Sequence, residues 1–445
     1  MQRTGRSPTG AGGRHRARPW EKAALVGLVL AVVSVLAFTA VASRYGDEDV
    51  GISEGRAVAV QRVLDRWAEA VRTDDADALT DLIDSEAAPS FVASESARAA
   101  NVSRIDFSDW GYELVGGDHD VDSGLAAALG VDEVWAPSVR LRYAIAGVDE
   151  VSTRKTISPT FVRRGDSWTL LDDRTSGEFA TWRGPWDFAP VVTRRVDTGD
   201  GATSMVIGHP GNESMIDRLA RELGPAVANV TELWGADWSR SALVMVTSSA
   251  QEFTSLVGAD HDGAHIAAVS VSDAPTPGDS AVGGQRIVFS PAAAERLTDD
   301  SRRAVLRHEL THVAARARTV DGSPMWLLEG YAEYCAHRST EDSARDIAPT
   351  LAARIDAGRK PDALPENSDF AQQGEDGSVA YETAWSITAF VADEFGEDSL
   401  TELYLALATG SSHEDDVDER LTETLGLEKD AFVERWSEWL NEQFT

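Results

Sequence analysis

The chain has 445 residues, of which 42% are hydrophobic, and it contains 13 Trp and 13 Phe. This composition can build the cores of about two domains, which excludes a chain that is disordered throughout. The formal net charge of −33 at pH 7 gives a surface that repels phosphate backbones, so we expect no binding of nucleic acid. The single cysteine, Cys335, excludes an intramolecular disulfide and a cysteine-based zinc site.

The N-terminus combines a basic segment with a long uncharged one. Residues 1–22 carry six basic side chains and one acidic one, and residues 23–43 carry no charge. About twenty apolar residues suffice to cross a bilayer as a helix, and the positive-inside rule keeps the basic tail in the cytoplasm. The sequence therefore predicts a single-pass anchor in the cell membrane, with the remainder of the chain extracytoplasmic. The alternative is a secreted protein whose signal peptide is cleaved after Ala40-Val41-Ala42.

Residues 55–180 begin with helical patterns and continue with strand-like ones. Apolar residues recur at helical spacing from Val58 to Val71, and a second short helix is predicted over 76–83. Residues 164–167 have the composition of a hairpin turn. Four runs predict antiparallel strands: 112–115, 134–145, 153–163 and 168–171. This order of elements resembles the nuclear-transport-factor-2-like (NTF2-like) α+β cone, which implies an accessory domain that supports the protein or binds a ligand.

Residues 181–200 are rich in turn formers and predict a boundary between domains. Beyond the boundary, a long amphipathic helix is predicted over Glu213–Trp234. Four strands are predicted around it, at 204–208, 243–247, 267–271 and Arg286–Phe289. From Asp300 onward the pattern is helical and ends in three helices that we expect to serve packing, at 399–408, 417–425 and Lys429–Phe444. A half with strands followed by a helical half predicts an α+β fold.

The segment 301–318 predicts a helix that carries the pattern of a metal site. His308 and His312 are four residues apart, so both imidazoles project from the same side of adjacent turns. This spacing allows two neutral imidazoles to reach one Zn²⁺ at about 2.0–2.1 Å. Glu309 is directed beside such a metal rather than at it, which is where a base must stand to take a proton from a bound water.

A second predicted helix supplies a third ligand. It follows the turn 321–324, in which Ser323 suits the N-cap and Pro324 the first helical position. Two antiparallel helices joined by a tight turn can bring Glu329 over the two histidines. Two imidazoles, one carboxylate and an open position for water form a catalytic zinc site rather than a structural one. We therefore predict that His308, His312 and Glu329 bind Zn²⁺.

The sequence HELTH, followed by WLLEGYAEY, is similar to that of the gluzincin metallopeptidases, the superfamily of thermolysin and aminopeptidase N, and especially to the peptidase-MA-like group. The resemblance covers residues 200–445, although the two quoted segments carry most of it. It implies a peptidase domain with a mixed sheet, the same three zinc ligands and Glu309 as the general base. It also implies that Glu333 is a carboxylate that holds a ligand imidazole, because a metal-bound histidine usually donates its other N–H to such a partner.

The resemblance implies two further parts of a peptidase site. Gluzincins supply a Tyr or His from the downstream helices as a donor to the oxyanion, and Tyr381, which opens the next long helix, is the candidate. The alternative for Tyr381 is an ordinary aromatic residue at a helix start. The strand Arg286–Phe289 is expected to be the edge strand that pairs with an extended peptide.

The absence of one motif from the sequence makes aminopeptidase activity less expected than other peptidase activities. The aminopeptidase branch anchors the amino terminus of its substrate with a Gly-x-Met-Glu-Asn stretch, which this sequence does not contain. We therefore expect an endopeptidase or a peptidase of narrow specificity, acting on a peptide or protein substrate. The alternative is a cell-surface binding or scaffold protein that keeps the zinc fold without turnover. His261 and His265 also have ligand spacing, but they lack an intervening base, and we expect them in an exposed loop.

Overall fold

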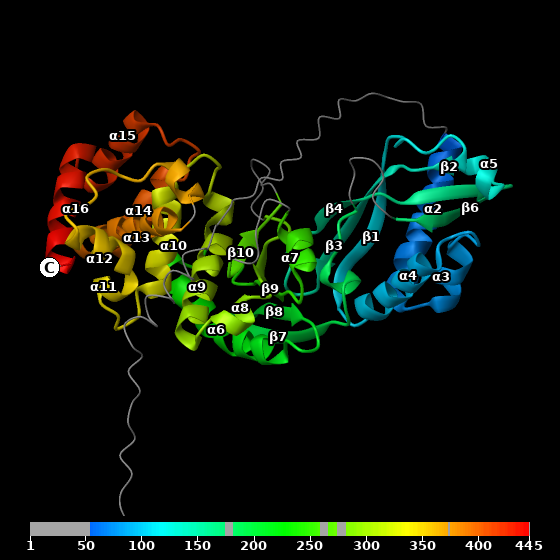
Figure 1. Cartoon of the computed structure of the whole chain (residues 1–445), viewed down its shortest axis with the longest axis horizontal. Coiled ribbons are helices and arrows are strands. Elements are labelled where there is room, and N and C mark those ends of the chain that lie inside the picture. Colours follow the sequence, from blue (N-terminus) through cyan, green and yellow to red (C-terminus); the bar gives the residue numbers. More distant parts are fainter. Residues whose placement is uncertain (1–53, 174–180, 259–265, 274–281, 373, 445) are drawn as a thin grey trace, which may run out of the picture.

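The computed structural model of the chain describes residues 54–173, 181–258, 266–273, 282–372 and 374–444 (Figure 1). The predicted basic tail and apolar segment lie outside the described residues, and so do His261 and His265. Among the helices that are described, none is both long enough and apolar enough to span a membrane. The described residues confirm an α+β fold with a mixed sheet and a helical C-terminal half.

Residues 54–173, called the N-terminal segment below, pack three helices against two small sheets. The helices are α2 (Glu54–Thr73), α3 (Ala76–Leu82) and α4 (Pro89–Val102), and a short helix α5 (Leu125–Leu129) follows the first strand. One sheet has the order β1-β3-β4, with strands Phe107–Gly116, Ser138–Ile145 and Thr153–Ile157. The other has the order β2-β5-β6, with strands Glu133–Trp135, Thr160–Arg164 and Ser167–Asp172. The predicted hairpin turn is confirmed, because Arg164 pairs with Ser167 across it. The resemblance to an NTF2-like cone stays a prediction.

Two predicted strands of this segment are wrong for the same reason. The run 134–145 is divided into β2 and β3, and the run 153–163 is divided into β4 and β5. Each division falls at a proline, Pro137 or Pro159, which has no N–H to donate to a ladder of hydrogen bonds. At each proline the chain leaves one of the two sheets and enters the other.

The C-terminal part opens with a five-stranded mixed sheet of order β10-β11-β9-β8-β7. Its strands are β7 (Val192–Gly199), β8 (Ala202–Gly208), β9 (Leu243–Val246), β10 (Ala268–Val271) and β11 (Arg286–Phe289). The strands β8, β9 and β11 run parallel to one another, whereas β7 and β10 are antiparallel to their neighbours. The edge strand next to β11 is therefore β10.

Two predictions are corrected by this topology. The turn-rich stretch 181–200 holds a 3-10 helix, η1 (Pro185–Asp187), and then the whole of β7, so only its first part is irregular. Arg286–Phe289 is not an edge strand, because β11 has β9 on one side and β10 on the other. Strand order cannot be read from chain order here, since the later strand is inserted between two earlier ones.

The five-stranded sheet is covered on both faces, which Figure 1 shows as a sheet between the N-terminal segment and the helices. Successive side chains of a strand point to opposite faces. On β9, Val244 and Val246 belong to the core formed with the helices, whereas Leu243 and Met245 belong to the core formed with the N-terminal segment. The other strands divide in the same way, with Val206, Ala268, Ile287 and Phe289 in the first core and Met205, Ile207, Val269 and Val288 in the second.

The N-terminal segment also contacts the end of the edge strand through polar groups. Lys155 Nζ lies 3.0 Å from Asp273 Oδ1, two residues beyond the end of β10. Thr153 Oγ1 donates a hydrogen bond to the other carboxylate oxygen of Asp273. The C-terminal end of β10 is therefore fixed by residues of β4.

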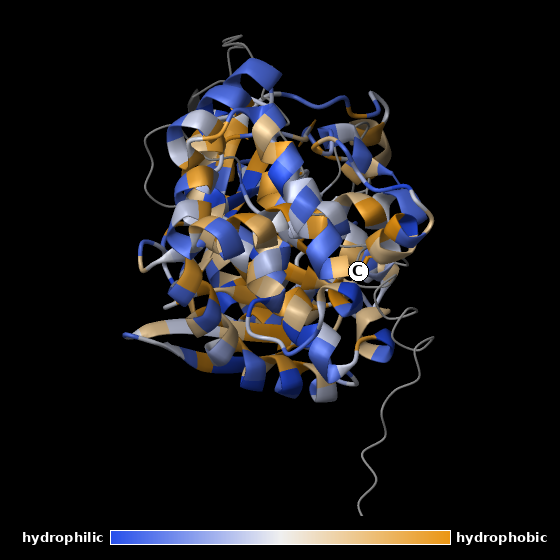
Figure 2. Ribbon diagram, turned by 90° about the vertical axis from the view of Figure 1, so that its left-hand side faces the viewer, coloured by the Kyte–Doolittle hydropathy of each residue, from blue (hydrophilic) through white to orange (hydrophobic). Residues whose placement is uncertain are grey.

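The remaining elements are helices. Most of them cover one face of the sheet and then form the C-terminal half, whereas α7 (Ala250–Val257) packs Phe253 and Val257 into the core shared with the N-terminal segment. The helices α6 (Glu213–Trp234) and α16 (Lys429–Phe444) have the predicted bounds. The helices in Figure 2 carry both apolar and polar residues, as expected of amphipathic helices around a core. The others are α8 (Ala293–Arg296), α9 (Asp299–Ala315), η2 (Arg316–Arg318), α10 (Met325–His337), α11 (Ala344–Ile347), α12 (Pro349–Asp356), η3 (Asn367–Ala371), α13 (Glu375–Phe395), α14 (Glu397–Leu407) and α15 (Glu414–Leu425).

Candidate metal centre

Helices α9 and α10 hold the predicted ligands, and each has a defined start. At the N-terminus of α9, Thr298 caps the helix by accepting a hydrogen bond from Ser301 N at 3.3 Å. The predicted cap of α10 is wrong by one residue, because Pro324 is the N-cap and Ser323 Oγ donates instead to Val320 O at 2.6 Å. Asn367 Oδ1 accepts the hydrogen bond of Met325 N at 2.8 Å, so a residue of η3 caps α10.

A glycine allows α10 to approach α13 closely beside the site. A Cβ on Gly330 would overlap the carbonyl oxygen of Ala384 and lie 2.9 Å from Thr388 Cγ2. Thr388 Oγ1 donates a hydrogen bond of 2.8 Å to Gly330 O. Because Gly330 follows Glu329 directly, this contact holds the part of α10 that carries Glu329 against α13.

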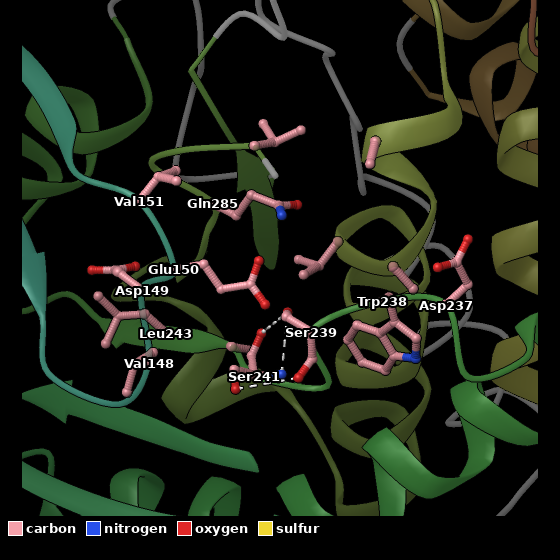
Figure 3. Close-up of a pocket in the computed structure, with 15 residues that line it drawn as sticks. Val148, Asp149, Glu150, Val151, Asp237, Trp238, Ser239, Ser241, Leu243 and Gln285 are labelled. Carbon is pink, nitrogen blue, oxygen red and sulfur yellow. Dashed lines mark hydrogen bonds between the residues drawn. The ribbon is translucent and has the colours of Figure 1, made fainter. Parts of the chain in front are cut away.

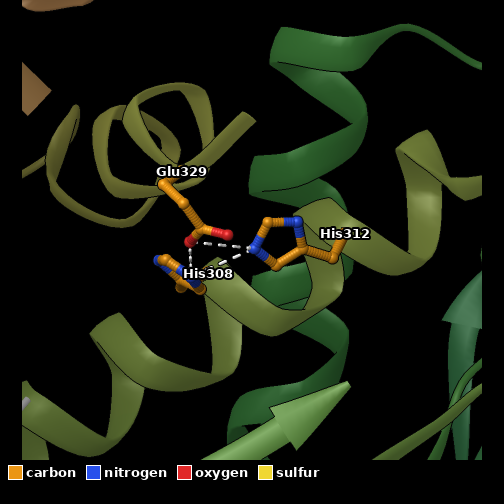
Figure 4. Close-up of side chains that lie close together, drawn as sticks. All are labelled: His308, His312 and Glu329. Atoms are coloured by element: carbon orange, nitrogen blue, oxygen red, sulfur yellow. Dashed lines mark hydrogen bonds and ion pairs between the residues drawn. The ribbon is translucent and has the colours of Figure 1, made fainter. Parts of the chain in front are cut away.

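Three ligand atoms converge where α9 faces α10 (Figure 4). The Nε2 atoms of His308 and His312 are 3.1 Å apart. Glu329 Oε2 lies 3.3 Å from Nε2 of His308 and 3.5 Å from Nε2 of His312. These residues form a group of side chains that could hold a metal ion among the residues described.

The spacing of these atoms fits a tetrahedral ion. Metal–ligand bonds of about 2.0–2.1 Å in a tetrahedral zinc site place neighbouring ligand atoms about 3.3–3.4 Å apart. The three measured separations, from 3.1 to 3.5 Å, bracket that value. Glu329 Oε2 is also buried with no hydrogen bond from another described residue, which a cation at this point would compensate. The donor set of two imidazoles and one carboxylate, with room for a fourth ligand, is that of catalytic zinc sites.

Glu333 lies behind His308, one turn after Glu329. Its Oε1 atom is 3.3 Å from His308 Nδ1, the ring nitrogen that faces away from the other ligands. Its Oε2 atom is 3.6 Å from Nε2 of His337, which is a further turn along α10. A carboxylate at this position favours the tautomer of His308 that leaves Nε2 free to bind a metal.

Burial and charge shift the ionisation of these groups. Burial disfavours the charged form of His308, but the carboxylates of Glu333 and Glu329 outweigh burial and raise the pKa of His308 well above its ordinary value. Burial likewise opposes ionisation of Glu329, yet the two histidines outweigh it and lower the pKa of that carboxyl. Glu329 is therefore held in its ionised form at the point where the two imidazoles converge.

Glu309 lies on α9, between His308 and His312 in the sequence. It is fully buried, and burial raises the pKa of its carboxyl above the ordinary value. Its Oε2 atom accepts a hydrogen bond from the hydroxyl of Ser270 on the edge strand β10. Its Oε1 atom has no hydrogen-bond partner among the described residues. A buried carboxylate with one free oxygen and a raised pKa suits a group that takes a proton and later returns it.

Tyr381, the predicted oxyanion donor, lies near the start of α13. Its side chain is buried, and its ring packs edge-on against Phe370 with ring centroids 5.1 Å apart. On the same helix, Glu382 Oε2 accepts a hydrogen bond from Leu351 N at 2.5 Å, and burial raises the pKa of Glu382 to about 7. The catalytic role of Tyr381 stays a prediction.

A surface pocket lies apart from this centre (Figure 3). It is lined by residues 148–151 of the N-terminal segment, by the loop around Trp238 and by Val313 and Ala314 of α9. With about 100° per residue in an α-helix, Val313 and Ala314 point to a different side of α9 from the two histidines. The pocket is therefore separate from the candidate metal centre.

The sequence did not identify three residues that complete the site: Ser270, His337 and Asn367. His337 follows Glu333 at a spacing of four residues on one helix, so that pair could have been found from the sequence. Ser270 is a polar residue between Val269 and Val271, which is a weaker signal. Asn367 caps a helix that begins far earlier in the chain, and no local pattern indicates it.

Comparisons with known proteins find similarity only among solved structures. No family model matches the chain, and no curated protein matches it. An M1 zinc metallopeptidase mutant from Deinococcus radiodurans bound to a Tyr-Ser-Ala substrate shows 15% identity and a TM-score of 0.32, over 62% of this chain and 58% of that one. Another structure, of the M1 zinc metallopeptidase from the same organism, shows 12% identity and a TM-score of 0.33, over 75% of this chain and 71% of that one.

Aminopeptidase A of Legionella pneumophila, in complex with aspartic acid, shows 14% identity and a TM-score of 0.35. The match covers 76% of this chain and 33% of that one. The chain thus spans less than two thirds of the length of the first of these structures, at 58%. Similarity at this level assigns neither a family nor an activity to the chain.

Proposed function

We propose that the chain is a zinc-dependent peptidase. The observation that carries the proposal is the triangle of His308 Nε2, His312 Nε2 and Glu329 Oε2, with sides of 3.1 to 3.5 Å. A structural zinc site would use four protein ligands, whereas three ligands and an adjacent base suit hydrolysis. Of the three ligand side chains, His312 keeps the largest exposure, at 10%, so solvent and substrate reach the centre on its side.

In this proposal, His308, His312 and Glu329 hold Zn²⁺, and Glu333 orients His308. When bound, zinc supplies a Lewis acid for the attacking water and for the carbonyl of the scissile bond. Glu309 takes the proton of the water as its oxygen attacks the carbonyl carbon, and then gives that proton to the leaving amine nitrogen as the C–N bond breaks. Tyr381 is our candidate for a hydrogen-bond donor to the oxyanion.

The edge strand β10 supports an extended peptide as the substrate. An edge strand offers unpaired main-chain groups to an added strand, and β10 carries Ser270, which contacts Glu309. The sequence of β10, Ala268–Val271, has no acidic or amide side chain that could hold a substrate amino terminus. We therefore propose cleavage within a peptide rather than removal of its first residue.

We also propose that the protein is exported and held at the cell membrane by residues 23–43. The support is the uncharged apolar run itself and the basic residues before it. Cells that express the full chain should retain it in the membrane fraction after alkaline extraction. Release of the protein into the medium with a new N-terminus near residue 43 would instead indicate a cleaved signal peptide.

The test of the activity combines metal content with cleavage. The purified protein should hold one equivalent of zinc and cleave members of a mixed peptide library, with internal rather than terminal cleavage products. Glu309→Gln should keep the zinc and lose about a hundredfold or more of kcat, because a general base contributes on that scale. Glu295→Gln on α8, an exposed glutamate, is the matched control and should behave as the wild type.

Two outcomes would count against the proposal in different ways. Absence of zinc from the purified protein, together with no uptake on titration, would refute the metal centre. Zinc at one equivalent with no cleavage of any peptide would favour the alternative, a binding or scaffold protein that keeps a zinc fold.

A further inference from the structure

The side chain of Ser270 points from the edge strand toward the helix that carries the metal ligands. Alternation along β10 places Ala268 in the core with the helices and Val269 in the core with the N-terminal segment, so Ser270 faces the helices again. Ser272 confirms this alternation, because its Oγ accepts a hydrogen bond of 3.0 Å from Arg316 Nε beyond the end of α9. Ser270 and Ser272 therefore share one face, but only Ser270 reaches Glu309.

The hydroxyl of Ser270 has two acceptors, and both belong to Glu309. It donates to the carboxylate oxygen Oε2, and it lies 3.1 Å from the main-chain oxygen of the same residue. A hydroxyl has one proton to donate, and a hydrogen bond to an ionised group is about twice as strong as one between neutral groups. The proton therefore goes to the carboxylate while Glu309 is ionised, and the main-chain oxygen is an alternative acceptor once Oε2 no longer carries charge.

The main chain of Ser270 faces the side of β10 on which no described strand pairs. Ser290 N donates to Ala267 O at 2.9 Å, which places the main-chain groups of Ala267 toward the neighbouring strand β11. Main-chain groups alternate between the two sides of an antiparallel strand, so those of Ser270, three residues on, point away from β11. One residue thus offers its main chain to an added strand and its side chain to the base.

We propose that Ser270 is a positioning residue that anchors one oxygen of Glu309 and leaves the other to accept the proton of the attacking water. This inference rests on the proposed peptidase function. Ser270 holds Oε2, and Oε1, which is buried without a partner among the described residues, is the oxygen that forms the new O–H bond. The O–H bond of the water breaks as its oxygen attacks the carbonyl carbon. The proton on Oε1 then passes to the amine nitrogen as the C–N bond breaks.

The experiment compares four variants of the full-length protein by kcat, KM and zinc content. Ser270→Ala should lower kcat about ten- to a hundredfold, the effect of losing a hydrogen bond to a charged group, with zinc still at one equivalent and KM changed less than threefold. Ser270→Thr keeps the hydroxyl and should recover most of kcat. Ser272→Ala is the matched control, since it removes a hydroxyl that points the same way, one residue beyond the end of β10, without touching Glu309.

The fourth variant, Ser270→Ala combined with Glu309→Gln, separates positioning from general damage to the fold. If Ser270 acts through Glu309, adding Ser270→Ala to the Glu309→Gln variant lowers kcat by less than about a further twofold, because the two residues act as a unit. Full additivity of the two losses would overturn the proposal. Equal kcat for Ser270→Ala and Ser272→Ala, in a wild-type protein that cleaves peptides, would also overturn it and leave the proposed function standing. A wild-type protein that binds zinc without cleaving any peptide would overturn both.

Discussion

Arg286 and Asp149 form a buried ion pair that joins the N-terminal segment to the five-stranded sheet. The two Nη atoms of Arg286 lie 2.6 and 3.0 Å from the two carboxylate oxygens of Asp149, and the side chains are only 5% and 7% exposed. Asp149 Oδ2 also accepts a hydrogen bond from Ile145 N at 2.7 Å. The guanidinium carbon of Arg286 lies 5.4 Å from the ring centroid of Tyr143, so its flat face is covered as well. The N-terminal segment thus supplies both the carboxylate that pairs with this guanidinium and the ring beside it.

Removing the carboxylate of this pair should destabilise the whole protein. We expect Asp149→Ala to lower the free energy of unfolding by about 3–5 kcal/mol, because it leaves the charge of Arg286 buried without a carboxylate to balance it. Urea denaturation followed by tryptophan fluorescence measures this change. Asp217→Ala is the matched control: its partner is Arg194, the two side chains are 44% and 42% exposed, and the expected loss is about 1 kcal/mol or less. If both variants lost the same free energy of unfolding, the buried pair would contribute no more to stability than the exposed one.

Glu333→Gln should weaken zinc binding without removing any of the three ligands. The carboxylate lies 3.3 Å from His308 Nδ1, and replacement of such a partner typically costs about ten- to a hundredfold in metal affinity. Competition with a zinc chelator measures the affinity. Glu397→Gln serves as the control, because Glu397 on α14 binds Tyr334 of α10 and Arg338 just beyond it but does not contact the ligands. An unchanged affinity for Glu333→Gln would remove the orienting role that we assign to Glu333.

Gly330→Ala should push the ligand helix away from α13. The added methyl group would overlap the carbonyl oxygen of Ala384, which cannot move without moving its helix. We expect a loss of about 1–3 kcal/mol in stability and weaker zinc binding, because Glu329 is the adjacent residue. Thermal unfolding and chelator competition measure the two effects. Gly55→Ala, at a position in α2 where a Cβ meets nothing within 4 Å, should be neutral or slightly stabilising. A stable Gly330→Ala protein with normal zinc affinity would contradict the close contact.

His209 should make the stability of the protein depend on pH. Burial disfavours its charged form, but Glu252, whose Oε1 lies 2.6 Å from His209 Nε2, outweighs burial and raises the pKa of His209. The stabilisation by this pair is therefore complete below the pKa of an unfolded histidine, about 6.5, and is lost as the pH rises through the higher pKa of the folded state. Urea denaturation at several pH values should show the advantage of the wild type over His209→Gln shrinking across that window.

The control for this pH dependence removes the negative partner. In Glu252→Gln the pKa of His209 is no longer raised by a carboxylate and burial opposes its charged form, so the difference caused by a further His209→Gln substitution should not shrink as the pH rises above about 6.5. An advantage of the wild type that stays constant from pH 6 to pH 9 would contradict the assignment.

The parts of the site that could be predicted are those set by local geometry. His308 and His312 lie side by side because an α-helix repeats at nearly four residues. Glu329 joins them because only residues 316–324 connect α9 to α10, so the two helices pack as neighbours. The two proline breaks at Pro137 and Pro159 could have been predicted as well, since the missing N–H is visible in the sequence.

The parts that could not be predicted depend on long-range pairing or on a polar interior. The order of β10 and β11 follows from contacts between segments far apart in the chain, and the bond between Ser270 and Glu309 depends on that order. The helix α4 had no apolar stripe to reveal it, because its buried side includes Glu95 and Arg98. Arg98 pairs there with Asp173 at 2.9 Å, so charge complementarity replaces hydrophobic periodicity in the buried face of this helix.

The core that the five-stranded sheet shares with the N-terminal segment limits where the chain can be cut or recombined. A fragment cut near residue 181 would lose the N-terminal segment from the face of the sheet that carries Met205, Ile207, Leu243, Met245 and Val288, and only α7 would still pack on that side. A contiguous apolar patch of this kind leads to self-association in water. Expression of residues 181–445 alone should therefore give aggregates rather than a soluble enzyme. The N-terminal segment, for the same reason, cannot be exchanged for an unrelated module unless the new partner brings its own complementary apolar face.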